Sequence, residues 1–186
     1  MDIDWNRELY DQLDWHWSNQ LRPRLDGLTD DEYFWEPVAG CWSVRPRGTS
    51  TAPISVGAGD FTCDYAMPEP TPPPVTTIAW RLAHIIVGVL GQRTASHFGG
   101  PPVDYESFAY AGTAAGALGQ LDEVYAGWSK GVRELGADGL ARPCGKAEGP
   151  YAKDPLGTLI LHINRETIHH GAEVALLRDL YAHGLR

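Results

Sequence analysis

The sequence predicts an all-α protein built as a four-helix bundle, with a long Pro/Gly-rich loop between the first and second helices. Apolar residues recur every three or four positions over four long segments, which is the spacing of one helix face. Gly or Pro residues lie at the ends of most of these segments. A length of 186 residues suits one ordinary domain. We therefore predict a single helical domain over residues 1–186, with the irregular loop insertion at about 36–75.

The first helix is predicted from Trp5 to Leu21. Its apolar residues recur every four positions and form one face: Trp5, Leu9, Leu13, Trp17 and Leu21. The segment 22–24, with a proline in its middle, should end or kink this helix. Four aromatic side chains lie on this helix: Trp5, Tyr10, Trp15 and Trp17.

A short helix and then the long loop should follow. Thr29 and Glu32 match a capping box, which predicts a short helix that ends before Pro37. Residues 36–75 are rich in Pro, Gly, Ser and Thr, and this composition predicts a loop, with a strand pair considered at about 53–65. Loops of this length inside compact domains are often functional, so we expect a partly ordered lid over the body.

Three further long helices complete the predicted bundle. The second spans about 76–98 and is apolar nearly all round, which indicates a central position. The third spans about 113–135, with apolar residues alternately three and four apart. The fourth follows Asp154-Pro155 and continues to about Tyr181.

Charge and cysteine content argue against several classes of protein. The chain has 15 Lys plus Arg against 24 Asp plus Glu, a formal charge of −9, and no basic run. We therefore expect neither a nucleic-acid partner nor a membrane partner. Cys41, Cys63 and Cys144 form neither a disulfide framework nor a metal-ligand spacing, and no apolar run is long enough for a bilayer. These features predict a cytoplasmic protein with no cysteine nucleophile.

The predicted last helix carries a Glu and a His on one apolar stripe. The stripe consists of Leu159, Ile163, Glu166, His170, Val174, Leu177 and Tyr181. A buried carboxylate needs a partner, and a divalent cation would supply one. Residues four apart lie about 5–6 Å apart at Cβ, so Glu166 and His170 can reach the same ion. His84, which lies within an apolar run of the second helix, is the best candidate for a third ligand.

Other interpretations of these residues remain open at this point. Glu166 and His170 could form an ordinary i,i+4 pair on a solvated helix, and His84 could be a core histidine bonded to a carbonyl. If the three do bind a metal, a His2Glu set leaves one position open for water or substrate, as in catalytic zinc sites. Nickel, iron or manganese would also accept these ligands.

The last predicted helix resembles a motif of the DinB-like superfamily. The resemblance lies in His162-Ile-Asn-Arg-Glu166-Thr-Ile-His-His170-Gly and the Arg178 that follows, and Ala83-His84-Ile85 resembles the ligand motif of the second helix. It implies a DinB-like four-helix bundle with a mononuclear divalent metal, most simply zinc. It also implies a homodimer, for which the aromatic side chains of the first predicted helix are interface candidates. In the branch of the mycothiol-dependent maleylpyruvate isomerases, the resemblance implies His84, Glu166 and His170 as the metal ligands.

One feature departs from the commoner motif of that superfamily. The commoner pattern is His-x-x-x-His, then one residue, then Gly, and this register would select Arg165 and His169. Arginine cannot bind a metal, so we prefer Glu166 and His170, although Gly171 then comes one place early. His169 remains an alternative ligand. His162 is either a further ligand or neighbour of Glu166, or a surface histidine.

The resemblance implies a metal-dependent thiol S-transferase that acts on a small-molecule electrophile. A low-molecular-weight thiol such as mycothiol would bind the metal as a thiolate. One alternative is a metal-dependent hydrolase of the YfiT type, in which bound water attacks the substrate. Another is a non-catalytic metal-binding or helical interaction protein of stress response. In both enzymatic readings the reacting group is bound to the metal, and no catalytic side chain is identified.

Overall fold

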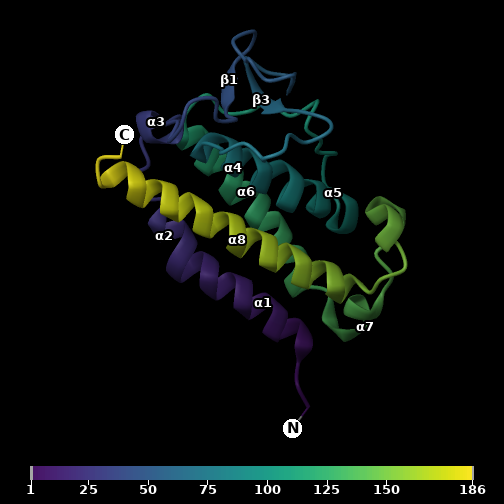
Figure 1. The fold of residues 1–186 in the computed structure, drawn as a ribbon. Helices are drawn as coiled ribbons and strands as arrows, with labels where there is room; N and C mark the ends of the chain where they lie inside the picture. Colours follow the sequence, from purple (N-terminus) through teal and green to yellow (C-terminus); the bar gives the residue numbers. More distant parts are fainter. Residues whose placement is uncertain (1, 186) are drawn as a thin grey trace.

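The computed structural model describes residues 2–185, and four long helical segments form its body (Figure 1). The first consists of α1 (Trp5–His16), the π-helical turn η1 (Trp17–Leu21) and α2 (Arg22–Arg24). The second consists of α4 (Ile78–His84), the π-helical segment η2 (Ile85–Gly91) and α5 (Gln92–Phe98). The other two are α6 (Ala114–Arg133) and α8 (Leu156–Ala182). All four lie close to the ranges that apolar periodicity predicts.

Side chains at the helix starts explain where these segments begin. Thr77 and Thr113 accept hydrogen bonds from the backbone N–H groups three residues ahead, at the starts of α4 and α6. Asp4 does the same for α1. Each bond satisfies one of the amide groups that a helix start leaves without an intrahelical partner. Pro155 precedes α8 and has an extended conformation that ends the preceding segment.

The predicted fold class, an all-α four-helix bundle, is wrong. Residues 44–65 form a three-stranded antiparallel sheet in the order β1-β3-β2, made of β1 (Val44–Pro46), β2 (Ile54–Val56) and β3 (Phe61–Tyr65). The short helix α3 (Asp30–Tyr33) lies where the capping pattern predicts it, and the Thr29 side chain accepts a hydrogen bond from the Glu32 amide. The short helices α7 (Gly136–Ala141) and η3 (Lys146–Tyr151) are further departures from a plain bundle. The pairing of β2 with β3 falls where a strand pair was considered. The outer partner β1 was not foreseen, because three residues ending in proline carry almost no strand signal.

The sheet is tied to the start of α4 rather than free as a lid. The amide of Trp42 donates to the carbonyl of Val75 at 3.0 Å, and the amide of Thr77 donates to the carbonyl of Trp42 at 2.9 Å. Inside the sheet, the buried carboxylate of Asp64 accepts hydrogen bonds from the Ser43 amide and the Arg45 guanidinium, both at 2.9 Å. These bonds hold the insertion in a fixed position above α4 (Figure 1).

The core fills the space between the four helical segments. Helix α6 packs against η2 and α1, and α8 packs against α1, α4 and η2. Trp17 is 7% exposed and stacks on Tyr125 with ring centroids 3.7 Å apart, so it belongs to the core and is not free for an interface. Trp5 and Trp15 do lie on the surface, at 62% and 59% exposure.

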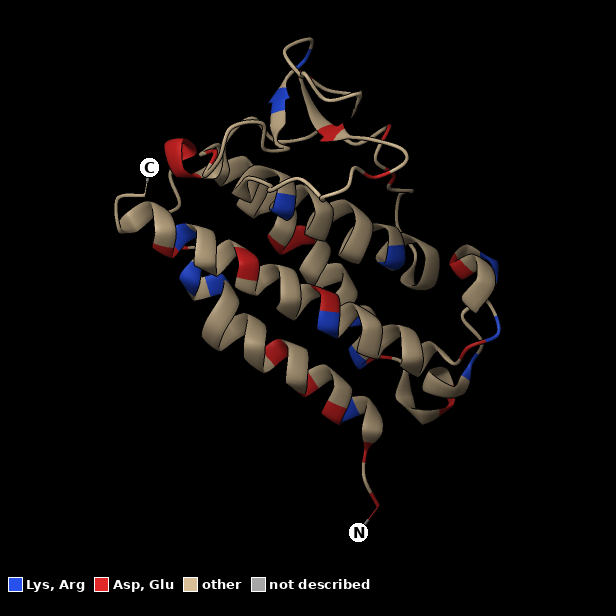
Figure 2. Ribbon diagram, viewed as in Figure 1, with Lys and Arg blue, Asp and Glu red and all other residues tan. Residues whose placement is uncertain are grey.

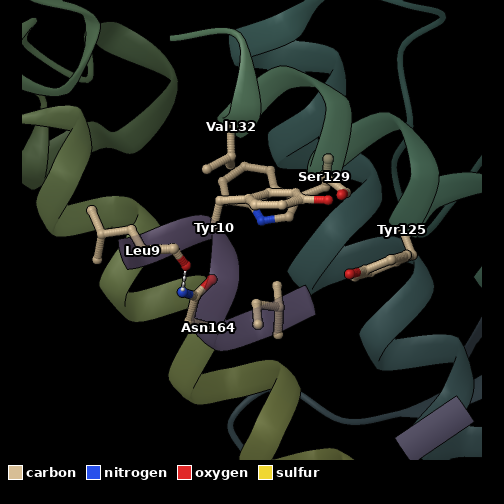
Figure 3. Close-up of a pocket in the computed structure, with 8 residues that line it drawn as sticks. Leu9, Tyr10, Tyr125, Ser129, Val132 and Asn164 are labelled. Atoms are coloured by element: carbon tan, nitrogen blue, oxygen red, sulfur yellow. Dashed lines mark hydrogen bonds between the residues drawn. The ribbon is translucent and has the colours of Figure 1, made fainter. Parts of the chain in front are cut away.

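Between α1, α6 and α8 the packing leaves one small gap. Figure 3 shows this region, where the Asn164 side chain donates a hydrogen bond of 2.9 Å to the carbonyl of Leu9. The gap has a volume of about 10 Å³. That is at most the room of one water molecule, so this part of the structure offers no ligand site. None of the helices within residues 2–185 combines the length and apolar character that crossing a bilayer requires.

A buried ion pair fastens the end of α8 to α3. Arg178 donates two hydrogen bonds, of 2.7 and 3.1 Å, to the two carboxylate oxygens of Glu32, which is 5% exposed. The same guanidinium also donates to the carbonyls of Arg24 and Asp26. Figure 2 shows the charged positions that gather where α2, α3 and the end of α8 meet. Removing one partner would leave the other charge buried and unpaired.

We expect Arg178→Met to lower the free energy of unfolding by about 3 kcal/mol, because Glu32 would lose its counter-charge inside the protein. The neighbouring pair of Arg24 and Asp179 is about half exposed, so Asp179→Asn should cost less than about 1 kcal/mol. Urea denaturation followed by circular dichroism measures both. Equal losses in the two variants would contradict the role given to Arg178.

Candidate metal centre

His84 is the last residue of α4 and lies directly before the π-helical segment η2. Its ring stacks on Trp80, with centroids 5.6 Å apart and planes 13° apart. Its Nδ1 lies 2.9 Å from the hydroxyl of Tyr105, which leaves Nε2 for a metal. Burial is the main cause that lowers the pKa of His84 to about 4, and the charges of His170 and Arg81 add to it. At neutral pH the ring is therefore uncharged, the form that binds metals.

His170 reaches the same place from α8. Its ring centroid lies 4.7 Å from that of His84, with the rings nearly perpendicular at 84°. Its Nε2 lies 3.4 Å from a carboxylate oxygen of Glu166, one turn earlier in the helix. The three residues predicted from the sequence therefore come together where α4 faces α8.

The carboxylate of Glu166 is partly exposed and surrounded by basic groups. His162 lies 3.5 Å away and Arg165 lies 3.4 Å away, measured to the same carboxylate oxygen. Burial by itself would raise the pKa of Glu166, but the nearby charges outweigh it and the pKa lies below its ordinary value. Glu166 is thus an anionic oxygen donor beside two imidazoles, a set that suits zinc and related divalent ions.

A second carboxylate, Glu173, holds His170 from its other side. Its Oε2 lies 2.7 Å from Nδ1 of His170, and Arg81 Nε lies 2.9 Å from the same oxygen. A carboxylate that accepts a hydrogen bond from Nδ1–H fixes the tautomer in which Nε2 is free to bind a metal. The sequence analysis missed Arg81 and Glu173. Arg81 lies three residues before His84, and Glu173 lies three residues after His170. This spacing puts each beside its histidine on a helix, and it was the available signal.

His169, the alternative ligand, belongs to an overlapping cluster. One ligand atom each from His169, His170 and Glu173 lie within 4.8 Å of one another, so this group could also hold a divalent ion. The His169 side chain is 64% exposed and lies 3.6 Å from Glu173. The inner set (His84, Glu166 and His170) and the outer set (His169, His170 and Glu173) share only His170, so variants can separate them.

Two cavities meet beside His84. The aromatic cavity, with a volume of about 470 Å³, lies between the sheet insertion and α4. The polar cavity, about 200 Å³, lies between η2 and α8 and is lined by side chains that include Gln92, Arg93, His162 and Glu166. His84 and Tyr105 line both cavities. A group bound at His84 would therefore face two differently shaped and differently charged spaces.

Two glycines allow the close approaches on which this region depends. A Cβ at Gly88 would overlap the Tyr105 hydroxyl, so glycine lets Tyr105 reach His84. A Cβ at Gly171 would lie 2.9 Å from Leu21, so glycine next to His170 lets α8 approach η1. Packing against Leu21 thus explains why glycine directly follows His170.

The cysteines offer no nucleophile. All three are buried, and burial raises the pKa of each thiol: Cys41, Cys63 and Cys144. Cys63 lines the aromatic cavity, but only as a small apolar side chain.

We expect Gly88→Ala to displace the Tyr105 side chain and to lower the free energy of unfolding by about 1–3 kcal/mol. Gly119→Ala in α6 is the matched control, because nothing lies within 4 Å of a Cβ there. It should be neutral or stabilise the helix by up to about 1 kcal/mol. Urea denaturation gives the stabilities, and nitrogen chemical shifts of the His84 ring report the Tyr105 contact. An unchanged Nδ1 shift in Gly88→Ala would contradict this dependence.

Comparison with known proteins gives a family. No curated protein and no solved structure matches the chain. The model of the DinB superfamily matches residues 12–174, which include every residue of both candidate ligand sets. The match begins within α1 and ends within α8, so it covers the helical body and the sheet insertion together. The chain therefore belongs to the DinB superfamily.

Proposed function

We propose that this protein is a metal-dependent thiol S-transferase, which joins a low-molecular-weight thiol of the mycothiol type to a small electrophile. The metal, most simply zinc, would be held by His84, Glu166 and His170. The observation that carries the proposal is the pair of cavities that share His84 and Tyr105. A transferase must bring two substrates to one ion from different sides, whereas a hydrolase needs only one cavity besides a bound water.

The linings of the two cavities suit two different substrates. Gln92, Arg93 and His162 offer hydrogen-bonding groups in the polar cavity, which suits a thiol rich in hydroxyl and amide groups. The aromatic cavity would then hold the electrophile. A divalent ion at the inner set supplies a Lewis acid that favours the thiolate form of a bound thiol.

The remaining chemistry rests on the side chains around His84. Burial raises the pKa of Tyr105, so its hydroxyl stays protonated and can hold His84 or donate to an oxygen of the electrophile. Trp80 covers one face of the His84 ring and limits the access of water. Arg81 and Glu173 keep His170 in a fixed orientation.

Two other functions are alternatives, and only the first uses the same ligands. A hydrolase of the YfiT type would keep the inner set and use bound water. A non-catalytic protein of stress response would need only the helical surfaces, and Trp5 and Trp15 on α1 are exposed side chains through which a homodimer could form. We favour the transferase because neither alternative accounts for the polar cavity.

The first test is metal content, measured by plasma mass spectrometry after loading with zinc and desalting. We expect about one ion per chain, because the inner set is mononuclear. His84→Asn and Glu166→Gln should lose the ion while circular dichroism shows that both remain folded. His169→Asn, the matched control on the same helix, should retain it. Loss in His169→Asn with retention in His84→Asn would assign the ion to the outer set instead.

The second test separates the reactions. Zinc-loaded protein is given mycothiol and monochlorobimane, and the fluorescent conjugate is followed over time. We expect zinc-dependent conjugation that Glu166→Gln abolishes. Hydrolysis of nitrophenyl esters without any need for the thiol would favour the hydrolase. A folded protein that takes up neither zinc nor nickel would overturn both enzymatic readings.

A further inference from the structure

The aromatic cavity has walls from the sheet insertion and from the segment that follows it, residues 80–106. Its volume of about 470 Å³ lies within the range of small-molecule sites. It is lined by Trp42, Val56, Cys63, Asp64, Tyr65, Met67, Glu69, Trp80, His84, Tyr105 and Glu106. Because the sheet insertion is tied to the start of α4 at Trp42, the shape of this space is fixed by backbone hydrogen bonds.

One wall is a row of aromatic rings that leads to His84. The Tyr65 and Trp42 centroids are 6.1 Å apart, and Trp42 and Trp80 follow at 5.9 Å. Trp80 then stacks on His84 at 5.6 Å. Trp80 is also held from the sheet, because its Nε1 donates a hydrogen bond of 2.8 Å to the carbonyl of Asp64. The first two pairs are tilted, with interplanar angles of 43° and 40°, so the wall turns along its length. A small planar molecule can stack on one or two of its rings.

The side chains that line the cavity and are charged at neutral pH are all carboxylates. Its lining includes three carboxylates and, among residues 2–185, no Lys or Arg. Asp64 is neutralised by Arg45 at 2.9 Å, and it also accepts a hydrogen bond from Ser50. Glu69 and Glu106 line the cavity and are exposed to solvent. Like charges would therefore oppose a carboxylate or phosphate ligand.

We propose that the aromatic cavity binds an uncharged aromatic molecule of one or two rings, stacked along Trp42 and Trp80 with one end at His84. The cavity thereby selects against anionic substrates. Its role as the electrophile site rests on the proposed function, but binding itself does not. The Arg81 guanidinium near the Trp80 ring does not alter this charge balance, because Glu173 neutralises it and Arg81 is not part of the lining.

The test compares two probes of equal shape, 2-naphthol and 2-naphthoate, by titration calorimetry at neutral pH. The probes are compared on metal-free protein, because a zinc ion beside His84 would itself attract the carboxylate of 2-naphthoate. We expect 2-naphthol to bind about tenfold tighter than 2-naphthoate, because only the latter carries a negative charge. The double variant Glu69→Gln/Glu106→Gln should reduce this tenfold difference in affinity, because it removes two negative charges from the lining. Equal or tighter binding of 2-naphthoate would overturn the proposal.

Aromatic variants locate the site. Trp42→Leu should weaken 2-naphthol binding about fivefold or more through loss of the stacking surface. Tyr65→Leu is a second variant at a more exposed position, in case Trp42→Leu does not fold. Trp15→Leu, an exposed tryptophan on α1, is the matched control and should leave binding unchanged. Undiminished binding in folded Trp42→Leu and Tyr65→Leu would contradict the assignment.

The outcomes also separate this inference from the proposed function. Binding of 2-naphthol that depends on Trp42, in a protein that takes up no metal, would support the cavity and refute the transferase. Thiol transfer by the zinc-loaded protein without binding of 2-naphthol would support the transferase and refute this substrate class.

Discussion

The structure depends on one constraint: a group of ionisable side chains, some buried and some partly exposed, meets against an apolar helical body and must be satisfied there. His84, Glu166, His170, Glu173 and Arg81 all meet where α4 packs against α8. Each has a partner in the group, and the partners come from two helices far apart in sequence. A body that needed only stability could fill this space with apolar residues at no loss. The retention of five ionisable groups at one crossing is therefore an argument for a function.

Local backbone features permit the contacts where α4 packs against α8. His84 is followed by the π-helical segment η2, and such segments often lie at functional sites because they change the direction of neighbouring side chains. Gly88 gives room for Tyr105, and Gly171 lets α8 approach η1. These features contribute little to the stability of an isolated helix, and glycine in a helix even opposes it. Their value lies in the contacts that they permit around the two histidines.

The sheet insertion depends on the helical body for its stability and shapes the space beside His84. It is short, and its strands β1 and β2 have three residues each, so it would not be stable alone. The hydrogen bonds of Trp42 to Val75 and Thr77, together with buried Asp64, attach it to the helical body. The result is an aromatic wall that ends at His84. The helical body thus carries the candidate metal centre, and the insertion shapes the larger space beside it.

Sequence patterns predict the four long helical segments and single out three candidate ligands, because helix periodicity and i,i+4 spacing are local properties. His84, Glu166 and His170 could be singled out as polar residues on apolar faces before their distances were known. Tertiary structure alone decided the sheet, since β1 pairs with β3 through contacts that no short stretch of sequence encodes. It also decided that Arg81, Tyr105 and Glu173 surround the histidines, and that two cavities share His84. Long-range packing brings such residues together, and a single sequence does not record it.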